Sequence, residues 1–438
     1  MTRFICQAPA FVVILAGRIY QVVNDRRQMT AQTLYWLIIA IVLSEYALNT
    51  MMTILNIKAS RWDIPAALSD VYDQKEYERQ QECSRRRRKF SLVSNAFSTL
   101  VTLALFAFGG FALFDQAARS ASGSPVVQAL VFWGIFYFIS WIINIPFDAY
   151  YTFVIEEKFG FNKTSRKTFI SDNLKSLAMN VVIMGALLSL CVWIYTLTPK
   201  YFWLLAWAVI SLFTLFIQYF YSQLIVPLFN KQTPLPEGEL RNAIEGFAKK
   251  VDFRLKDIYV MDSSKRSTHA NAYFTGFGAR KRIVLFDTLI EQLSTEEIVG
   301  VLAHEIGHYK RHHIILSMAG GMLTTLVMLY LFNLVIGSDS IAAAAGASQA
   351  SFHLNLAVFS LIFTPVSIVM DIVSNAFSRR HERQADEFAR ANGYGPAVAS
   401  GLKKMTAKSL GSLTPHPVVV FISHSHPTLL QRVEALTK

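Results

Sequence analysis

The stretch SLAMNVVIMGALLSLCVWIYTLTP, from Ser176 to Pro199, contains no charged side chain. After Lys200, the run YFWLLAWAVISLFTLFIQYFYSQLIVPLFN from Tyr201 to Asn230 contains none either. A helix needs roughly 20 predominantly apolar residues to cross the hydrocarbon core of a bilayer. Both runs meet that length, so the sequence predicts two membrane-spanning helices joined by a very short link.

Five further stretches meet the same criterion with at most one charge each: Ala31–Ile57, Phe90–Phe114, Ser124–Phe147, Ile314–Ser338 and Leu354–Phe377. One such stretch alone could be the core helix of a soluble domain, but seven together predict a mainly α, multi-pass membrane protein. The composition agrees, because charged residues make up 16% of the 438 residues against about 25% in soluble proteins. The hydrophobic content of 53% excludes a disordered chain. Three widely spaced cysteines exclude a disulfide scaffold and an all-cysteine zinc site.

The positive charge lies mainly in alternate connections between these spans. Residues 58–89, 148–175, 231–313 and 378–438 hold 36 of the 42 Lys and Arg residues. Basic connections stay on the cytoplasmic side, so we expect the N-terminus outside and the C-terminus in the cytoplasm, in a bacterial inner membrane or an endoplasmic reticulum membrane. The net charge of +12 then reflects the orientation of the chain in the membrane. We expect some of these basic residues to contact anionic membrane lipid. We expect no nucleic-acid partner, because no stacking aromatics or known module accompany the basic residues.

The order of spans and connections divides the chain into five parts. These are an N-terminal tail (1–30), five spans (31–230), a cytoplasmic catalytic segment (231–313), two spans (314–377) and a C-terminal segment (378–438). The tail fits either an interfacial helix or a poor signal-like region. In the catalytic segment, apolar residues three or four apart predict an amphipathic helix over Leu240–Phe253. Asp257–Met261 and Arg282–Phe286 are rich in β-branched and aromatic residues and predict short strands.

The most informative motif is His304-Glu305-Ile306-Gly307-His308. The preceding Ser294-Thr295-Glu296-Glu297 is typical of a capping box, which predicts that the motif lies on a helix. Two histidines four residues apart share one helix face, as required to bind one zinc ion. Zinc lowers the pKa of a bound water, and Glu305 would act as the general base that takes the proton of this water. The alternative is a structural pair of histidines near a basic membrane interface.

His312 continues the four-residue spacing. It lies about 12 Å along the helix axis from His304, so both cannot bind one ion. We interpret His312 and His313 as part of the charged edge of the sixth span.

A catalytic zinc generally needs a third protein ligand. After the seventh span, Glu382 and Asp386 share a helix face within Ser378–Asp386. Glu382 as an oxygen ligand would complete a set of two histidines and one glutamate. Asp386, one turn later, suits an acceptor that holds a ligand imidazole by its other N–H. From the spacing alone, Glu382 and Asp386 could equally be two acidic residues on an exposed helix face that also carries arginines.

Several segments together resemble the integral-membrane CAAX prenyl protease family, type 1, the a-factor-converting zinc metalloproteases. Beside the zinc motif and the Glu382/Asp386 pair, the resemblance rests on four segments: Phe153–Lys163 (FVIEEKFGFNK), Tyr259–Arg266 (YVMDSSKR), Asn271–Gly278 (NAYFTGFG) and Ser425-His426-Pro427 with Arg432. It extends from about the second span to the C-terminus, and the tail 1–30 carries none of it. The chain departs from the family in its short link between the sixth and seventh spans.

The resemblance implies seven tilted helices around a large, water-filled intramembrane chamber, with a small α+β metalloprotease domain. One zinc ion would lie near the cytoplasmic end of the chamber, with His304, His308 and Glu382 as ligands. Asn271, Ala272 and Tyr273 would form an edge strand that pairs with the substrate backbone. His426 and Arg432 would lie near the metal and stabilise the oxyanion.

The predicted function is that of an integral-membrane zinc endopeptidase. If the substrate of the family carries over, the enzyme removes the last three residues of a protein prenylated at a C-terminal CAAX sequence. The alternative is a broad-specificity quality-control protease of the heat-shock type. A third interpretation, a seven-span binding or transport protein with a structural metal, leaves Glu305 without a role.

Overall fold

The computed structural model describes residues 30–60, 63–275 and 281–438. Seven described helices are long and apolar enough to cross a membrane, which confirms the predicted fold class. They are α2 (Ala31–Ala59), α3 (Gln74–Ala107), α5 (Pro125–Tyr150, continued by the π-helical turn η2, Tyr151–Glu156), α6 (Arg166–Leu197), α7 (Phe202–Leu224, preceded by η3, Pro199–Tyr201), α11 (His313–Val335) and α13 (Phe352–Ala391). The predicted tail lies outside the described residues except Thr30, which caps α2 by accepting a hydrogen bond from the Thr33 amide.

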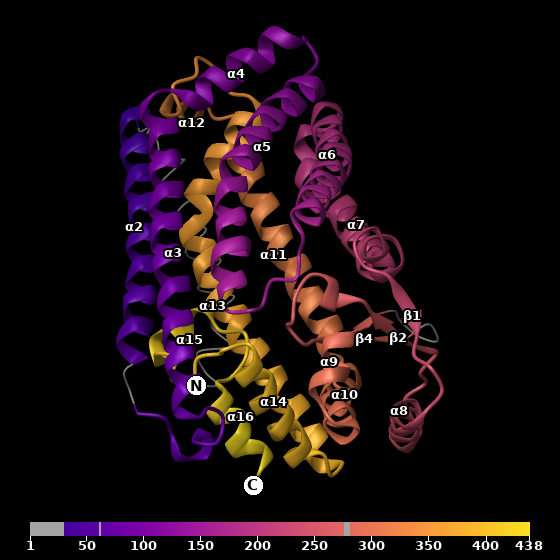
Figure 1. Cartoon of the computed structure of the whole chain (residues 1–438). Helices are drawn as coiled ribbons and strands as arrows, with labels where there is room; N and C mark the ends of the chain where they lie inside the picture. Colours follow the sequence, from indigo (N-terminus) through magenta and orange to yellow (C-terminus); the bar gives the residue numbers. More distant parts are fainter. Residues whose placement is uncertain (1–29, 61–62, 276–280) are drawn as a thin grey trace, which may run out of the picture.

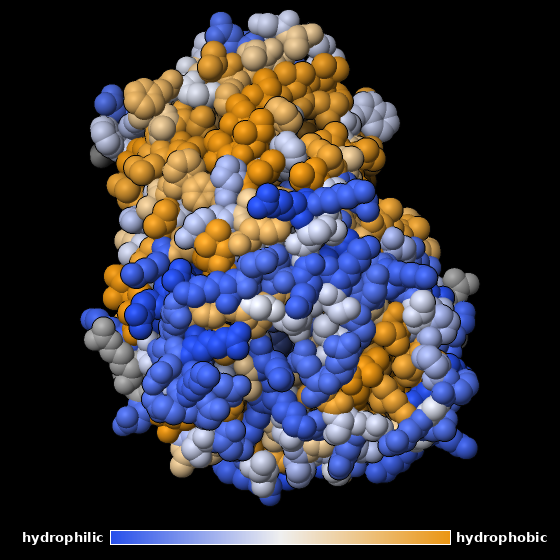
Figure 2. Space-filling view, viewed as in Figure 1, coloured by the Kyte–Doolittle hydropathy of each residue, from blue (hydrophilic) through white to orange (hydrophobic). Residues whose placement is uncertain are grey.

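The seven helices pack side by side in a closed sequence of neighbours. α2 packs on α3, α5 on α6, α6 on α7, α7 on α11, α11 on α13, and α13 returns to α2 (Figure 1). The remaining step, from α3 to α5, is made through α4 (Gly110–Ala121) and η2. The surface over the upper part of this bundle is predominantly hydrophobic, whereas the lower part is predominantly hydrophilic (Figure 2). This distribution is the one that a multi-pass membrane protein with one soluble end requires.

The predicted span over Phe90–Phe114 is confirmed as part of a membrane-length helix, but this helix begins before the apolar run and ends earlier than predicted. α3 begins at Gln74, capped by the Asp73 carboxylate, and ends at Ala107. The run Arg85–Lys89 therefore lies within a helix rather than in a link. The chain breaks at Gly109, whose φ of 65° is left-handed, and α4 then starts a separate helix. Glycine adopts this conformation without steric cost.

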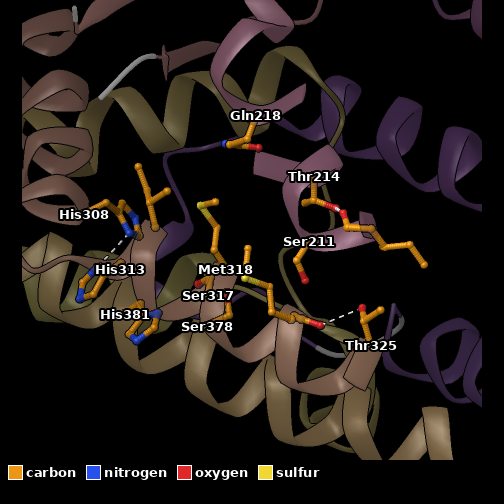
Figure 3. A pocket seen from close by; sticks show the side chains of 14 residues that line it. Ser211, Thr214, Gln218, His308, His313, Ser317, Met318, Thr325, Ser378 and His381 are labelled. Atoms are coloured by element: carbon orange, nitrogen blue, oxygen red, sulfur yellow. Dashed lines mark hydrogen bonds between the residues drawn. The ribbon is translucent and has the colours of Figure 1, made fainter. Parts of the chain in front are cut away.

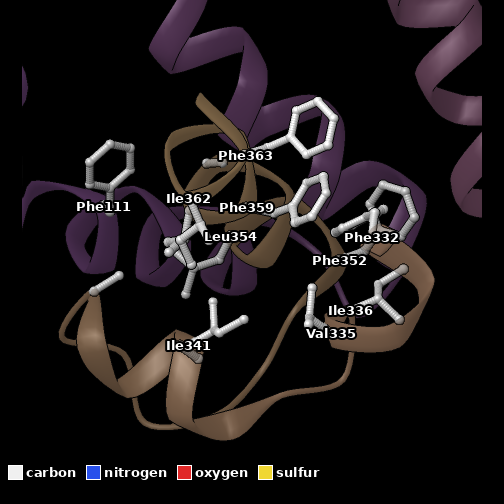
Figure 4. Close-up of a cluster of buried hydrophobic side chains, with 14 of the residues drawn as sticks. Phe111, Phe332, Val335, Ile336, Ile341, Phe352, Leu354, Phe359, Ile362 and Phe363 are labelled. Carbon is white, nitrogen blue, oxygen red and sulfur yellow. The ribbon is translucent and has the colours of Figure 1, made fainter. Parts of the chain in front are cut away.

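The end of the bundle away from the sheet is closed by two short helices. α4 and α12 (Asp339–Ala344) pack against α13 and α2 around a cluster of aromatic and aliphatic side chains (Figure 4). Phe132, Leu354 and Ile341 are almost inaccessible to solvent in this cluster. Asp115 of α4 also accepts a hydrogen bond of 2.7 Å from His353 Nε2 on α13. This end is held by apolar packing together with a buried polar contact.

The soluble end contains a four-stranded sheet in the order β1-β2-β4-β3. β2 (Asp257–Met261) and β4 (Arg282–Phe286) are parallel and have the predicted bounds. β1 (Gln232–Pro234) and β3 (Ala272–Thr275) pair antiparallel at the two edges. The predicted amphipathic helix forms as α8 (Glu239–Lys250) but ends three residues early, because Asp252 has a left-handed φ of 47°.

The remaining helices of the described chain include the one that carries the zinc motif, α10. They are η1 (Ala66–Leu68), η4 (Val226–Leu228), η5 (Ser263–Lys265), α9 (Asp287–Gln292), α10 (Thr295–Lys310), α14 (Gly395–Lys408), α15 (Pro417–Ser423) and α16 (Leu429–Leu436). The second hydrophobic core lies among them, with Ile283, Leu285 and Leu302 fully buried. α10 packs against α13, α14, α8 and α11 and so connects the soluble end to the bundle.

Candidate metal centre

The helix of the zinc motif begins at the predicted capping box. The Ser294 hydroxyl accepts a hydrogen bond from the Glu297 amide, and the Glu297 carboxylate accepts one from the Ser294 amide, which confirms this prediction. Glu297 also accepts hydrogen bonds from Ser400 (2.6 Å) and Lys404 (2.8 Å) on α14. The start of α10 is therefore fixed in position by the same carboxylate that satisfies its free amide.

Two glycines let α10 approach its neighbours closely. A Cβ at Gly307 would lie 3.0 Å from Ala385 Cα and 3.1 Å from the Ala385 carbonyl oxygen on α13. A Cβ at Gly300 would lie 3.2 Å from the backbone nitrogen of Val398 on α14. Such separations are tighter than nine in ten real Cβ contacts, so a side chain at either position would require the neighbouring helix to shift by a few tenths of an ångström. The absence of a side chain at Gly307 thus lets Glu382 of α13 reach the histidines of α10.

His304, His308 and Glu382 meet at one point. The two Nε2 atoms of the histidines are 3.2 Å apart. Glu382 Oε2 lies 3.4 Å from His304 Nε2, and Glu382 Oε1 lies 3.2 Å from His308 Nε2. Ligands about 2.0–2.1 Å from a tetrahedral zinc ion are roughly 3.3 Å from one another. The spacing of these three donors therefore fits a zinc ion, and all their ligand atoms lie within 4.8 Å of one another.

The hydrogen bonding of Glu382 supports the same conclusion. Its Oε2 is buried and has no hydrogen-bond partner among the described residues. A buried carboxylate oxygen without a partner loses several kcal/mol of solvation, and a cation bound between it and the imidazoles would restore that energy. The donor set of two imidazoles and one carboxylate is the one that catalytic zinc sites use.

Asp386 and Arg432 form a second layer around His304. Asp386 Oδ1 lies 2.8 Å from His304 Nδ1, the nitrogen that faces away from the other ligands. The Arg432 guanidinium donates two hydrogen bonds to Asp386, of 2.7 and 2.9 Å. Burial lowers the pKa of His304, but the Asp386 and Glu382 carboxylates outweigh this effect and raise it to about 9 in the absence of a metal ion. An acceptor on Nδ1 leaves Nε2 free for a metal ion.

His313 belongs to this site, contrary to our interpretation of it as a charged edge residue. Its side chain is buried, and its Nδ1 lies 3.0 Å from His308 Nδ1 (Figure 3). Its Nε2 lies 2.9 Å from Gln384 Oε1. The exposed residue His312 has a left-handed φ of 57°, which separates α10 from α11 and turns His313 back toward α10. The sequence assigned His312 and His313 together to the charged edge of the sixth span, because the spacing of residues does not reveal the left-handed backbone at His312 that separates them.

Glu305 and His426 complete the group of predicted site residues near the donors. Glu305 is half-buried, and its carboxylate has no hydrogen bond to another described side chain. Burial raises its pKa, an effect that the positive potential of His304 and His308 partly offsets. The exposed His426 side chain places Nε2 3.4 Å from Glu382 Oε1. Arg432 Nη1, which Asp386 leaves free, lies 3.6 Å from Glu382 Oε2.

The predicted substrate-binding strand is an edge strand. β3 includes Ala272 and Tyr273 and pairs on one side only, with β4. Asn271 precedes it, and its side-chain oxygen accepts a hydrogen bond of 2.8 Å from the Ala272 amide. The Tyr273 hydroxyl lies 3.4 Å from the Ser222 hydroxyl at the end of α7. The other edge of β3 carries backbone groups that no strand in the described sheet uses.

A cavity of about 540 Å³ opens beside the donors (Figure 3). Its wall includes His308 of α10, His313 of α11 and His381 of α13. From there it extends between α7 and α11 along apolar and hydroxyl side chains such as Ile210, Met318 and Thr325. The candidate metal centre is therefore accessible from a space between membrane-spanning helices.

Comparisons with known proteins agree with this geometry over nearly the whole chain. Residues 53–231 match the family described as CAAX prenyl protease N-terminal, five membrane helices, and residues 234–438 match peptidase family M48. CAAX prenyl protease 1 of Saccharomyces cerevisiae is 34% identical over 407 residues, which cover 86% of this chain and 89% of the relative. The human CAAX prenyl protease 1 homolog is 32% identical, with 85% and 88% covered.

The fold is similar to a solved structure of the same group. The crystal structure of S. mikatae Ste24p superimposes with a TM-score of 0.88 at 32% identity, covering 92% of this chain and 99% of that one. Sequence, fold and the cluster of two histidines and one glutamate thus point to one group of enzymes. The chain belongs to the CAAX prenyl protease 1 family within peptidase family M48, and it is a multi-pass membrane metalloprotease.

Proposed function

We propose that the protein is a zinc endopeptidase that removes the C-terminal three residues of prenylated CAAX substrates. The observation that carries the proposal is the convergence of His304, His308 and Glu382 on one point beside Glu305. The named function of the relatives, CAAX prenyl protease 1, supports the substrate class. One zinc ion per chain would be held by the three donors. When bound, zinc polarises the scissile carbonyl and makes a water molecule more acidic.

The side chains around the donors have distinct proposed roles. Glu305 has a free carboxylate, and it takes a proton from the attacking water and delivers it to the leaving amine. Its raised pKa brings the carboxylate closer to the range in which it both accepts and returns a proton near neutral pH. His426 Nε2 and Arg432 Nη1 lie on the Glu382 side of the site and donate to the oxyanion as it forms.

The substrate backbone is proposed to pair with the free edge of β3. Asn271, Ala272 and Tyr273 lie along this edge, and the Ala272 amide, which donates to the Asn271 side chain, would exchange that hydrogen bond for one to the substrate, as in other proteins that bind peptides by strand addition. Paired in this way, a substrate lies extended, with its side chains alternating between two faces. The cavity beside His308 gives an apolar group on the substrate a space between membrane-spanning helices.

The topology follows from the distribution of basic residues. We propose that the sheet, the metal centre and the C-terminus face the cytoplasm, as the rule of positive inner loops requires. The host membrane is then a bacterial inner membrane or the endoplasmic reticulum membrane. The partners are a peptide or protein substrate and the surrounding membrane lipid.

The quality-control protease remains the second candidate, and the match of residues 53–231 to the CAAX prenyl protease N-terminal family argues against it. Purified protein loaded with zinc would be assayed with a farnesylated CAAX peptide and with the same peptide lacking the farnesyl group. We expect release of the C-terminal tripeptide from the farnesylated peptide and much slower cleavage of the other. Equal rates, or cleavage at many positions, would favour the quality-control function.

A further inference from the structure

A second cavity lies across the bundle, between α2, α3, η2 and α15, and has a volume of about 690 Å³. Most of the residues that line it have polar side chains, among them Arg88, Asn56, Ser91, Ser94 and Asn95. None of the described residues that line it is acidic. A polar cavity that offers positive charge and no carboxylate is suited to an anionic ligand.

Arg88 is the group that makes this cavity an anion site. Its side chain is half-buried, and its one hydrogen bond among the described residues goes from Nη1 to the Asn56 carbonyl oxygen, at 2.7 Å. The neighbouring arginines differ, because Arg87 pairs with Glu156 and Arg86 pairs with Glu82. A guanidinium has five N–H donors in a planar fork. Arg88 therefore retains donors for a ligand that binds through two oxygens.

The α15 wall of the cavity is close in sequence to the metal centre. Ser423 lines the cavity, and His426, only three residues later, lies 3.4 Å from Glu382. Arg379, one turn before Glu382 on α13, donates hydrogen bonds to the carbonyls of Val420 and His424 and so fixes α15 to the ligand helix. Three extended residues span at most about 11 Å. The Ser423 side of the cavity therefore lies no farther than about one extended tripeptide from His426.

We propose that this cavity binds the free C-terminal carboxylate of the substrate through Arg88. The inference rests on the proposed function, in which the bond cleaved is three residues from the C-terminus. An extended tripeptide covers about 10 Å, which is similar to this upper limit on the separation between Ser423 in the cavity wall and His426 beside the donors. Arg88 would bind the carboxylate through two parallel N–H···O hydrogen bonds, and serine and asparagine side chains would donate further hydrogen bonds. Binding of the carboxylate at this site would then determine that three residues are removed.

The test compares two farnesylated CAAX peptides that differ only at the C-terminus, one ending in a carboxylate and one in a carboxamide. With the zinc-loaded wild-type protein in detergent, we expect the carboxamide to have a kcat/KM on the order of 10- to 100-fold lower, mainly through KM. In Arg88→Met this ratio falls to about 1, because the carboxylate has lost its partner. Arg88→Lys, which keeps the charge, retains part of the preference.

Arg86→Met is the matched control, because Arg86 belongs to the same basic run but is exposed and pairs with Glu82. It should keep the wild-type ratio. The comparison of the two peptides on the wild-type protein needs no variant, so it decides the question even if Arg88→Met does not fold.

Two results would overturn the inference while leaving the proposed function intact. The first is equal cleavage of the two peptides by the wild-type protein. The second is a kcat/KM ratio that is the same in Arg88→Met as in the wild type, together with stimulation of the wild type by added phosphatidylglycerol. If Arg88→Met abolishes that stimulation, the cavity binds a lipid phosphate instead. If the wild-type protein cleaves neither farnesylated peptide, the proposed function itself fails, and this inference fails with it.

Discussion

The Nδ1 atoms of His308 and His313 lie 3.0 Å apart, and His313 Nε2 lies 2.9 Å from Gln384 Oε1. If His308 binds the metal through Nε2, its proton lies on Nδ1 and is donated to His313 Nδ1. His313 must then carry its own proton on Nε2, which the Gln384 oxygen accepts. This chain of hydrogen bonds holds His308 in the tautomer and orientation that metal binding needs. Asp386 does the same for His304.

Replacing His313 should therefore weaken metal binding without removing a ligand. We expect His313→Ala to lower zinc affinity on the order of 10- to 100-fold, measured by competition with a chelator of known affinity. The control is His312→Asn, because His312 is exposed and asparagine tolerates its left-handed backbone. Unchanged zinc affinity in His313→Ala would show that His313 packs against His308 without orienting it.

The proposed base and the proposed ligand should respond differently to substitution. Glu305→Gln should keep zinc bound and lower kcat on the order of 10²- to 10⁴-fold, because only the proton transfer is lost. His304→Ala should lose both zinc and activity. Metal content by elemental analysis and tripeptide release from a farnesylated peptide check both variants. An active Glu305→Gln variant would remove Glu305 from the mechanism, and a zinc-loaded, active His304→Ala variant would contradict the ligand set.

Gly307 should be intolerant of even the smallest side chain. A Cβ there meets the backbone of Ala385, so Gly307→Ala should push α10 and α13 apart and separate Glu382 from the histidines. We expect reduced zinc content and a lower thermal unfolding midpoint in detergent. The control is Gly246→Ala in α8, where no atom lies within 4 Å of the added Cβ and alanine favours the helix. Similar behaviour of the two variants would show that the helix contact is adaptable.

The Asp386–Arg432 pair should contribute to stability as well as to the site. Both side chains are buried, and removing one member of a buried pair leaves the other charge uncompensated, at a cost of about 3–5 kcal/mol. We expect Asp386→Ala to unfold at a clearly lower temperature than the wild type. Glu387→Ala, at the residue after Asp386, breaks the exposed pair between Glu387 and Arg390 and should change stability little. Equal effects would indicate that solvent reaches Asp386.

The features that the sequence predicted well are those set by local pattern. Apolar runs of sufficient length with at most one charge each identified the seven membrane helices. Richness in β-branched and aromatic residues predicted the bounds of β2 and β4, and the Ser294/Glu297 pair marked the start of α10. These features depend on residues close together in the chain, so no knowledge of the fold is needed to infer them.

The features that the sequence did not predict depend on the backbone at single residues or on distant contacts. The break at Gly109 lies inside an apolar run, where hydropathy gives no sign of it. The left-handed conformation of His312 decides that His313 faces His308, and no spacing rule contains it. The approach of Glu382 to the histidines could be proposed from helix faces, but its distance depends on the packing at Gly307.

Asp115 should make stability depend on pH at the end of the bundle opposite the metal centre. Burial raises its pKa, but hydrogen bonds from His353, Arg119 and Ser351 outweigh burial and lower it to about 2. Because the folded pKa lies below the unfolded value of 3.8, the stabilisation is present above about pH 4 and is lost as the pH falls toward 2. The difference between the folded and unfolded pKa values corresponds to about 2 kcal/mol of folding stability. Thermal unfolding in detergent should therefore show a midpoint that falls between pH 4 and 2 more steeply in the wild type than in Asp115→Asn. Parallel curves for the two proteins would mean that the carboxylate is not held in its charged form by these donors.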